Sequence, residues 1–250
     1  MEKVKVFIIN LERSEDRKNF MQEQIQKLFT YNPNLKNQLE FEFFKAIDGS
    51  KNEHLQFKSH FPWWCQLVLG RELSDSEKSC FASHYSLWKK CQELNNPIII
   101  LEDDVIFSDE FLNNSNIIEK LLNSNYEYIR FYYLFDKRIH HLNNNFYISY
   151  ENTGGTQGYF IHSNAAKKFI KKAKYWFKPV DDYMDMYYYN KMQNIIYKPF
   201  LLDLNHMETT ITQRKKKLNI LSKIIREIIR FYFYILKITY NKKNISRIKN

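Results

Sequence analysis

The sequence predicts a single α/β domain built around a mixed, largely parallel sheet flanked by helices. Short apolar runs typical of strands alternate with helical patterns over the first 210 residues, without a repeat or a linker. One run, 97–107, is a continuous stretch rich in β-branched residues, as expected for a strand buried on both faces. Glycine and proline number only five each, which argues against a loop-rich all-β protein.

Size and composition narrow the class further. The 250 residues suffice for one substantial domain, and 44% hydrophobic and 17% aromatic residues exclude an intrinsically disordered chain. Cys65, Cys80 and Cys91 form no CxxC pair and are expected to be reduced thiols in a cytosolic protein. We predict neither a secretory signal nor a membrane-spanning helix.

The net charge of +10 is concentrated near the carboxyl end. Residues 211–250 hold twelve lysines and arginines and one acid, Glu227, whereas the other 210 residues hold 26 basic and 27 acidic groups. We therefore divide the chain into a nearly neutral domain, 1–210, and a basic segment, 211–250. Because the acidic groups of the domain would repel nucleic acid, no nucleic-acid partner is expected.

Local signals place the elements in chain order. Ser14 is predicted to cap the first helix and Ser74 to cap a helix that continues through Cys91. Between 51 and 70 the chain is aromatic and irregular, and is expected to pack on the core rather than to form a lid. The expected elements are a strand at 4–11, a helix at 14–28, strands at 41–47 and 97–107, a helix at 116–122, strands at 126–134 and 147–150, a glycine-rich stretch at 153–161, helices at 164–172 and from 179, and a final edge strand at 195–202.

Three consecutive carboxylates, Glu102, Asp103 and Asp104, follow the buried run. The carboxyl end of a strand is where open α/β sheets bind ligands. Like charges at this spacing raise one another's pKa, and a divalent cation removes that cost. Oxygen ligands suit Mg²⁺ or Mn²⁺, which commonly bind substrate phosphates as well. The cluster therefore predicts a metal site for a diphosphate; the alternative is an acidic turn that ends the strand.

Other candidate residues have equally simple alternatives. Arg13 and Arg17 at the first helix suit a nucleotide's phosphates or base, or else pair with the acids beside them. His84 lies on an apolar helical face, where a core histidine is more common than a ligand. Asp181 and Asp182 open a helix, where acids favour the dipole, or else one of them is a general base.

The basic segment has a helical pattern of its own. From Leu218 apolar residues recur at helical spacing, and Lys223, Arg226, Arg230 and Lys237 fall toward the other side. This amphipathic pattern predicts a helix at the surface of an anionic membrane. The alternative is a helix packed on the domain or in a dimer.

Several motifs occur together in one order. They are Phe7-Ile8-Ile9-Asn10-Leu11-Glu12-Arg13 with Asp16-Arg17, Ala46-Ile47-Asp48-Gly49, Ser79-Cys80-Phe81-Ala82-Ser83-His84-Tyr85-Ser86-Leu87-Trp88, Ile100-Leu101-Glu102-Asp103-Asp104 and Gly158-Tyr159-Phe160-Ile161. The ordered set resembles glycosyltransferase family 25, the bacterial lipooligosaccharide β-galactosyltransferases with their collagen galactosyltransferase relatives, over roughly residues 4–205. One departure is Ser79, where the family usually has glycine.

The resemblance implies an A-type glycosyltransferase fold, Rossmann-like, that uses UDP-galactose and inverts the anomeric centre. It implies that Asp104 binds Mn²⁺ or Mg²⁺ and that Glu102 reaches the ribose or the water on the metal, while His206 is an additional candidate ligand. Either Asp181 or Asp182 would be the base. The full set expected to bind the nucleotide sugar is Asn10, Arg13, Arg17, Asp48, Ser83, His84, Glu102, Asp103 and Gly158.

The expected function is therefore transfer of a hexose, galactose first, from a UDP-sugar donor to a lipooligosaccharide or lipopolysaccharide core acceptor. The expected location is the inner face of the cytoplasmic membrane, where residues 211–250 would hold the protein to a glycolipid-bearing surface. Two alternatives remain: a glucosyltransferase that uses UDP-glucose, and a non-catalytic membrane-associated adaptor with a degenerate transferase fold. A phosphatase or nuclease lacks the further carboxylates and histidine pairs that two metals require.

Overall fold

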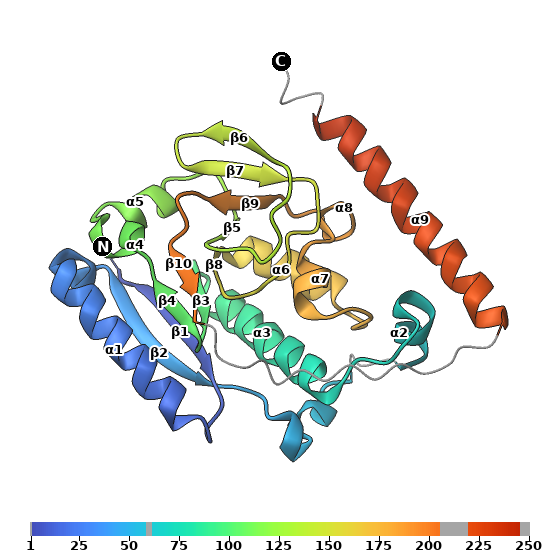
Figure 1. Cartoon of the computed structure of the whole chain (residues 1–250), viewed down its shortest axis with the longest axis horizontal. Helices are drawn as coiled ribbons and strands as arrows, with labels where there is room; N and C mark the ends of the chain where they lie inside the picture. Colours follow the sequence, from blue (N-terminus) through green and yellow to red (C-terminus); the bar gives the residue numbers. More distant parts are fainter. Residues whose placement is uncertain (1, 59–61, 206–219, 246–250) are drawn as a thin grey trace.

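The computed structural model describes residues 2–58, 62–205 and 220–245 and is organised around one eight-stranded sheet (Figure 1). The strand order is β2-β1-β3-β8-β5-β9-β7-β6, and β4 and β10 form a separate pair. Their bounds are β1 Val4–Asn10, β2 Leu39–Lys45, β3 Ile98–Glu102, β4 Val105–Phe107, β5 Tyr128–Arg130, β6 Ile139–Asn143, β7 Phe146–Ser149, β8 Gly158–Ile161, β9 Asn194–Tyr197 and β10 Leu202–Leu204.

The direction of the strands confirms a mixed, largely parallel sheet. β1 is parallel to β2 and β3, and β5 is parallel to β9. β8 runs antiparallel to both β3 and β5, and β7 runs antiparallel to both β9 and β6. Six of the eight strands therefore point one way, and only β7 and β8 point the other way.

Helices cover both faces of this sheet. Side chains alternate along the buried strands: Ile99 and Leu101 of β3 join one core with α1, α4 and α5, whereas Ile98 and Ile100 join another with α3, α6 and α7. The period-2 pattern thus confirms a strand buried on both faces. The helices are α1 Glu15–Tyr31, α2 Pro62–Leu69, α3 Asp75–Leu94, α4 Asp109–Asn113, α5 Ile117–Leu122, α6 Ser163–Lys172, α7 Val180–Met184, α8 Tyr187–Asn190 and α9 Ile220–Ile245.

The expected edge strand at 195–202 is wrong. β9 lies inside the sheet between β5 and β7, and β10 pairs only with β4. The reason is the hairpin of β6 and β7, which adds to β9 and makes β6 the edge. β6 has the polar sequence IHHLN, so no apolar pattern indicated it. The run at 97–107 also divides into β3 and β4 around the acidic turn.

The two predicted helix caps differ in outcome. Ser74 forms a capping box with α3, because its Oγ accepts from the Glu77 amide at 3.2 Å and Glu77 Oε2 accepts from the Ser74 amide at 2.8 Å. Ser14 stands at the start of α1 but makes no capping bond with its side chain, so that prediction is wrong. Its carbonyl instead accepts a hydrogen bond from Asn10 Nδ2 at 3.1 Å.

The aromatic stretch before α3 packs on the body in the part that the structure describes. Phe57 lies 5.5 Å from Trp176 between ring centres, and Trp64 makes an edge contact with Phe177. Trp63 is 59% exposed, stacked on Trp64. The packed arrangement expected from the sequence therefore holds for Phe57 and Trp64.

The basic segment forms α9, which runs along one side of the domain beside α2 and α8 (Figure 1). Phe233 stacks on Phe177, with ring centres 5.9 Å apart, and Tyr240 packs on Tyr187. The alternative of a helix packed on the domain is thus observed. None of the helices in the described residues combines the length and apolar content needed to cross a membrane.

The capping box leads to a stability prediction. Substitution Ser74→Ala removes an acceptor from the first turn of α3 and should lower the free energy of unfolding by about 1 kcal/mol. Ser14→Ala is the matched control, because Ser14 makes no side-chain cap, and should change it by less than about 0.5 kcal/mol. Urea denaturation followed by circular dichroism measures both, and equal losses would contradict the assignment.

Candidate active site

The carboxyl ends of β1 and β3 bring several candidate residues together. β3 ends at Glu102, and Asp103 and Asp104 form the turn that follows. Ile9 of β1 lies opposite Glu102 in the parallel register, so Asn10 reaches the same edge of the sheet. Asn10 Nδ2 donates to Asp103 Oδ2 at 2.7 Å.

Arg17 on α1 supplies a cation to this cluster. Its Nη1 donates to Asp103 Oδ1 at 2.8 Å and to Asp104 Oδ2 at 3.3 Å. The two aspartates are therefore unequal: Asp103 is buried with both oxygens bonded, whereas Asp104 has the longer contact. Burial and the neighbouring carboxylate of Glu102 raise the pKa of Asp104 to about 6, although Arg17 opposes the shift.

Glu102 is held by a histidine of α3 and a threonine of the loop before β8. Its Oε1 accepts from Thr156 Oγ1 and lies 3.6 Å from His84 Nε2. Burial alone would raise its pKa, but His84 and Thr156 more than offset burial, and the pKa of Glu102 is lowered. Tyr159 Oη lies 2.9 Å from His84 Nδ1 and accepts from Trp88 Nε1 at 2.9 Å. Because indole only donates, the tyrosine hydrogen is available to Nδ1, which leaves the imidazole proton on Nε2, toward Glu102.

The structure describes two of the three predicted metal ligands, Glu102 and Asp104. His206 lies outside the described residues, and Asp104 follows Glu102 by two positions, in the turn after β3. Within the described chain, one group of three donors lies close together: Cys80, His84 and Glu102, with ligand atoms within 4.8 Å of one another. Burial and nearby carboxylates raise the pKa of the Cys80 thiol, which therefore stays protonated and is a poor ligand. The oxygens of Asp104 and Glu102 fit a hard cation such as Mg²⁺ or Mn²⁺ better.

A buried ion pair shapes the glycine-rich stretch behind this cluster. Arg130 Nη2 lies 2.9 Å from Asp185 Oδ1, and both side chains are almost fully buried. Arg130 Nη1 donates to the carbonyls of Gly154 and Gly155 at 2.7 and 2.9 Å, and the Gly154 amide donates to Asp185 Oδ2 at 2.7 Å. Both glycines have positive φ, +67° and +85°, which favours glycine. The loop so formed delivers Thr156 to Glu102.

Sequence reasoning missed Arg130 and Asp185. The available signal was a charged residue between Ile129 and Phe131 in a strand that is otherwise apolar or aromatic. A charge buried in such a strand needs a partner. The partner, however, is 55 positions away and could not be identified from spacing.

The two candidate bases lie in different surroundings. Asp182 Oδ1 accepts from Asn152 Nδ2 at 2.7 Å. Burial, and then the charge of Asp182, raise the pKa of Asp181. Asp181 is thus the candidate base whose surroundings favour proton uptake.

Arg13 and Asp48 pair with each other. Asp48 is buried, accepts from Arg13 Nη1 and from the Ser50 amide at 2.9 Å, and caps a short turn. Although burial acts in the opposite direction, these contacts lower the pKa of Asp48 to about 2. Glu12 instead pairs with Lys45 at 3.0 Å. The simple alternative, in which each arginine pairs with the acid beside it, is therefore wrong.

Two candidates for nucleotide binding have structural roles. Ser83 Oγ accepts from the Ile47 amide at 2.9 Å and donates to a carbonyl of α3. A Cβ on Gly158 would lie 2.3 Å from Leu202 Cδ1 and 2.7 Å from Leu101 Cδ2. Glycine is therefore required there by close packing, and the structure does not direct either residue toward a ligand.

Comparison with known proteins assigns a family. The profile described as Glycosyltransferase family 25 (LPS biosynthesis protein) matches residues 3–184. The lipooligosaccharide biosynthesis protein lic2B of Haemophilus influenzae is 34% identical over 118 residues, 46% of this chain and 40% of the relative. The lacto-N-neotetraose biosynthesis glycosyltransferase LgtE of Neisseria meningitidis serogroup B is 28% identical over 174 residues, 63% of this chain and 61% of the relative.

Two further likenesses cover part of the chain. Human procollagen galactosyltransferase 2 is 32% identical over 112 residues, 42% of this chain and 16% of the relative. A crystal structure of a glycosyltransferase involved in glycosylation of the major capsid of PBCV-1 aligns with a TM-score of 0.36 and 10% identity, over 66% of this chain and 62% of that one. The chain covers less than two thirds of the length of each of these relatives.

The buried ion pair gives a stability prediction. Substitution Asp185→Asn leaves the Arg130 guanidinium buried without its countercharge and should lower the free energy of unfolding by about 3–5 kcal/mol. Asp136→Asn, on the exposed surface, is the control and should have little effect. Urea denaturation checks both.

A double-mutant cycle isolates the pair from the loop. The loss in Arg130→Met with Asp185→Asn should be smaller than the sum of the two single losses by about 1 kcal/mol or more. Additive losses, or a loss below about 1 kcal/mol for Asp185→Asn, would show that the pair does not hold the loop.

Proposed function

The chain belongs to glycosyltransferase family 25, and we propose that it transfers galactose from UDP-galactose to a saccharide acceptor of the lipooligosaccharide type, with inversion. The observation that carries the proposal is the cluster of Glu102, Asp103 and Asp104 at the carboxyl ends of β1 and β3. The choice of galactose draws on the names of the procollagen relatives, and the acceptor class on the name of a bacterial relative.

The donor site is proposed around Asp104. Asp104 and Glu102 would hold Mn²⁺ or Mg²⁺, with His206 as a further candidate ligand, and the cation would stabilise the charge on departing UDP. The raised pKa of Asp104 supports this assignment, because a neighbouring cation would relieve the crowding of its carboxylate. Arg17 and Asn10 orient Asp103 at the same edge, and the guanidinium of Arg17 adds positive charge for a diphosphate.

Asp181 is the proposed general base. An inverting transfer needs a group that accepts the proton of the acceptor hydroxyl as its oxygen attacks the anomeric carbon and the bond to UDP breaks. A raised pKa makes a carboxylate a stronger base, and the pKa of Asp181 is raised by burial and by Asp182. Asp182, which accepts from Asn152, is the control residue beside it.

α9 is proposed to hold the protein on the inner face of the cytoplasmic membrane. Its outer side exposes apolar side chains at helical spacing, while other α9 side chains pack on the body. An exposed apolar row on an amphipathic helix is typical of helices that lie in a membrane interface. The exposed side chains of this row are Leu221, Ile224, Ile228, Phe231, Tyr232 and Ile235.

The first test is release of UDP from UDP-galactose. With Mn²⁺ the wild-type protein should release UDP, and EDTA should abolish release. Asp104→Ala should lower the rate by about 100-fold or more, because it removes a proposed metal ligand. Asp136→Asn is the control and should behave as wild type.

UDP-glucose is included as a second donor in the same assay. Faster release of UDP from UDP-glucose than from UDP-galactose would identify glucose, rather than galactose, as the transferred sugar. No turnover of any UDP-sugar under any metal condition would contradict the transferase assignment and favour the non-catalytic adaptor.

The base assignment predicts a pH profile. Hydrolysis of UDP-galactose, with water as the acceptor, should fall about 10²–10⁴-fold in Asp181→Asn and only slightly in Asp182→Asn. Because the acid form of Asp181 cannot accept a proton and its pKa is raised, kcat/KM of the wild type should fall as the pH drops through that raised value. The acid limb should be missing in Asp181→Asn, and a dominant effect of Asp182→Asn would reverse the assignment.

Membrane binding is tested by flotation with vesicles that contain phosphatidylglycerol. Replacing Ile224, Ile228 and Phe231 together by serine should weaken binding by at least about tenfold, because each apolar side chain gains free energy on leaving water. Leu55→Ser removes an equally exposed apolar side chain from the body and is the control. Equal binding of all three proteins would rule out the apolar row as the anchor.

A further inference from the structure

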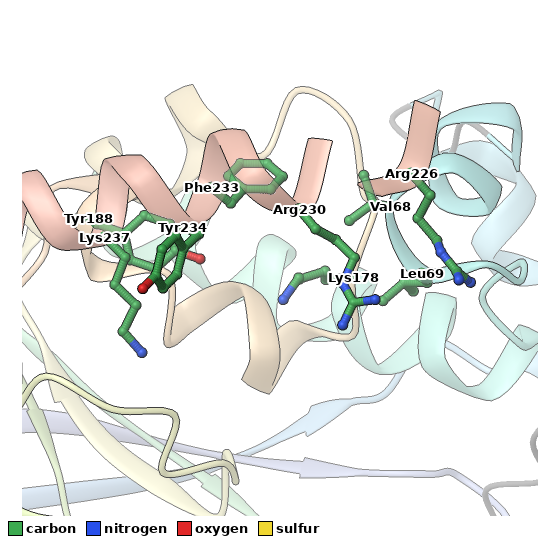
Figure 2. A pocket seen from close by; sticks show the side chains of 9 residues that line it. All are labelled: Val68, Leu69, Lys178, Tyr188, Arg226, Arg230, Phe233, Tyr234 and Lys237. Carbon is green, nitrogen blue, oxygen red and sulfur yellow. The ribbon is translucent and has the colours of Figure 1, made fainter. Parts of the chain in front are cut away.

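A basic cavity of about 430 Å³ lies between α9 and the body of the domain (Figure 2). α9 supplies most of its wall, and α2, α8 and the segment before α7 supply the rest. Its lining consists of Val68, Leu69, Lys178, Tyr188, Arg226, Arg230, Phe233, Tyr234 and Lys237. No carboxylate belongs to this lining.

Four cations converge on the cavity from two parts of the chain. Arg226, Arg230 and Lys237 lie on one side of α9, since spacings of four and eleven residues return to the same helical face. Lys178 comes from the segment before α7 and lines the same cavity as Arg230 (Figure 2). Like charges repel one another. The four cations therefore leave a surplus of positive charge in the cavity, which a bound anion would neutralise.

The acids near these cations do not balance them. Glu227 contacts Arg226 Nη2 at 3.4 Å and Arg230 Nη1 at 3.1 Å, but it is 59% exposed and contributes one charge. Among charged groups near Lys237 are Glu151 and Asp185, and Asp185 is already paired with Arg130.

We propose that this cavity binds the phosphate group of a phosphorylated saccharide. A phosphate ester carries about −1.5 to −2 charges at neutral pH, which suits several cations better than a single carboxylate does. Arginine binds phosphate with two parallel hydrogen bonds, and two arginines are available. The volume exceeds that of a phosphate alone and falls within the usual range for small-molecule sites. Val68, Leu69 and Phe233 offer an apolar wall for the carbon-bound hydrogens of a sugar ring.

The position of the cavity points to the acceptor. Lys178, which lines it, precedes the first residue of α7 by two positions, so the cavity lies on the α7 side of the candidate site. The inference rests on the proposed function in this respect: the phosphate would belong to the saccharide that accepts the hexose.

A lipid head group is the less suitable source of the phosphate. At 100° per residue, Arg226, Arg230 and Lys237 lie about half a turn around α9 from Ile224 and Ile228. The cations therefore face the body, whereas the exposed apolar row faces away from it. A lipid with its chains beside that row would have to place its head group on the other side of the helix.

Calorimetric titration with glucose 6-phosphate tests the site in the full chain, with glucose as the uncharged control. The wild type should bind glucose 6-phosphate, more weakly as salt is raised, and should not bind glucose. Arg230→Gln with Lys178→Gln should weaken binding about tenfold. Lys223→Gln, an exposed cation of α9 outside the cavity, should bind within twofold of wild type.

Glu227→Gln gives a variant with the opposite expected effect. It removes the carboxylate that competes for Arg226 and Arg230, so binding should tighten about twofold to fivefold. Absence of binding in wild type, or equal binding in the double variant, would overturn the proposal. A third outcome is that the wild type binds phosphatidic acid vesicles but not glucose 6-phosphate, and that the double variant loses the vesicle binding. This result would assign the cavity to a lipid head group.

Release of UDP from UDP-galactose separates this inference from the proposed function. Both measurements are made on the wild-type protein. Binding of glucose 6-phosphate without any turnover of UDP-sugars would overturn the proposed transfer and leave the anion site. Turnover without binding would overturn the anion site alone.

Discussion

The buried pair of Arg130 and Asp185 is the interaction on which the candidate site depends. Taking two charges out of water is expensive, and the cost is offset only where geometry and further hydrogen bonds are good. Here the guanidinium also binds the carbonyls of Gly154 and Gly155, and the carboxylate accepts from the Gly154 amide. The pair thus ties β5, the glycine loop and the end of α7 into one unit. Thr156 at the end of that loop donates a hydrogen bond to Glu102. The buried charge pair therefore helps to position the acidic cluster through this loop.

The three adjacent acids, Glu102, Asp103 and Asp104, differ in their hydrogen-bond partners and in their pKa shifts. Asp103 is saturated by Asn10 and Arg17 and serves to join β1, α1 and the turn. Glu102 is held by His84 and Thr156, contacts that more than offset its burial. Asp104 receives the weakest support and has its pKa raised to about 6. Divergent environments of neighbouring carboxyl groups commonly separate their roles, and here they single out Asp104 as the residue with unused capacity for a cation.

Local patterns predicted what depends on local physics. The apolar run at 97–107 indicated a strand buried on both faces, and the capping residues at Ser74 indicated the start of α3. What failed depends on distant contacts. The interior place of β9 is set by a hairpin whose edge strand is polar, and the partners of Arg13 and Arg17 come from other segments. Gly158 is required by leucines of β3 and β10, a contact that no spacing reveals.

The amphipathic pattern of α9 does not determine which side of the helix packs on the domain. A sequence shows that apolar and basic residues lie on different sides of a helix, but it does not show which side the domain takes. In the structure, the side of α9 that carries Phe233 and Tyr240 packs on the domain, and the adjoining cations line the cavity. The row with Ile224 and Ile228 is exposed to solvent. Charge and apolar surface, which an interfacial helix would present to one membrane, are thereby separated. Arg226, Arg230 and Lys237 line a cavity beside the domain, and the exposed apolar row lies on the opposite side of the helix.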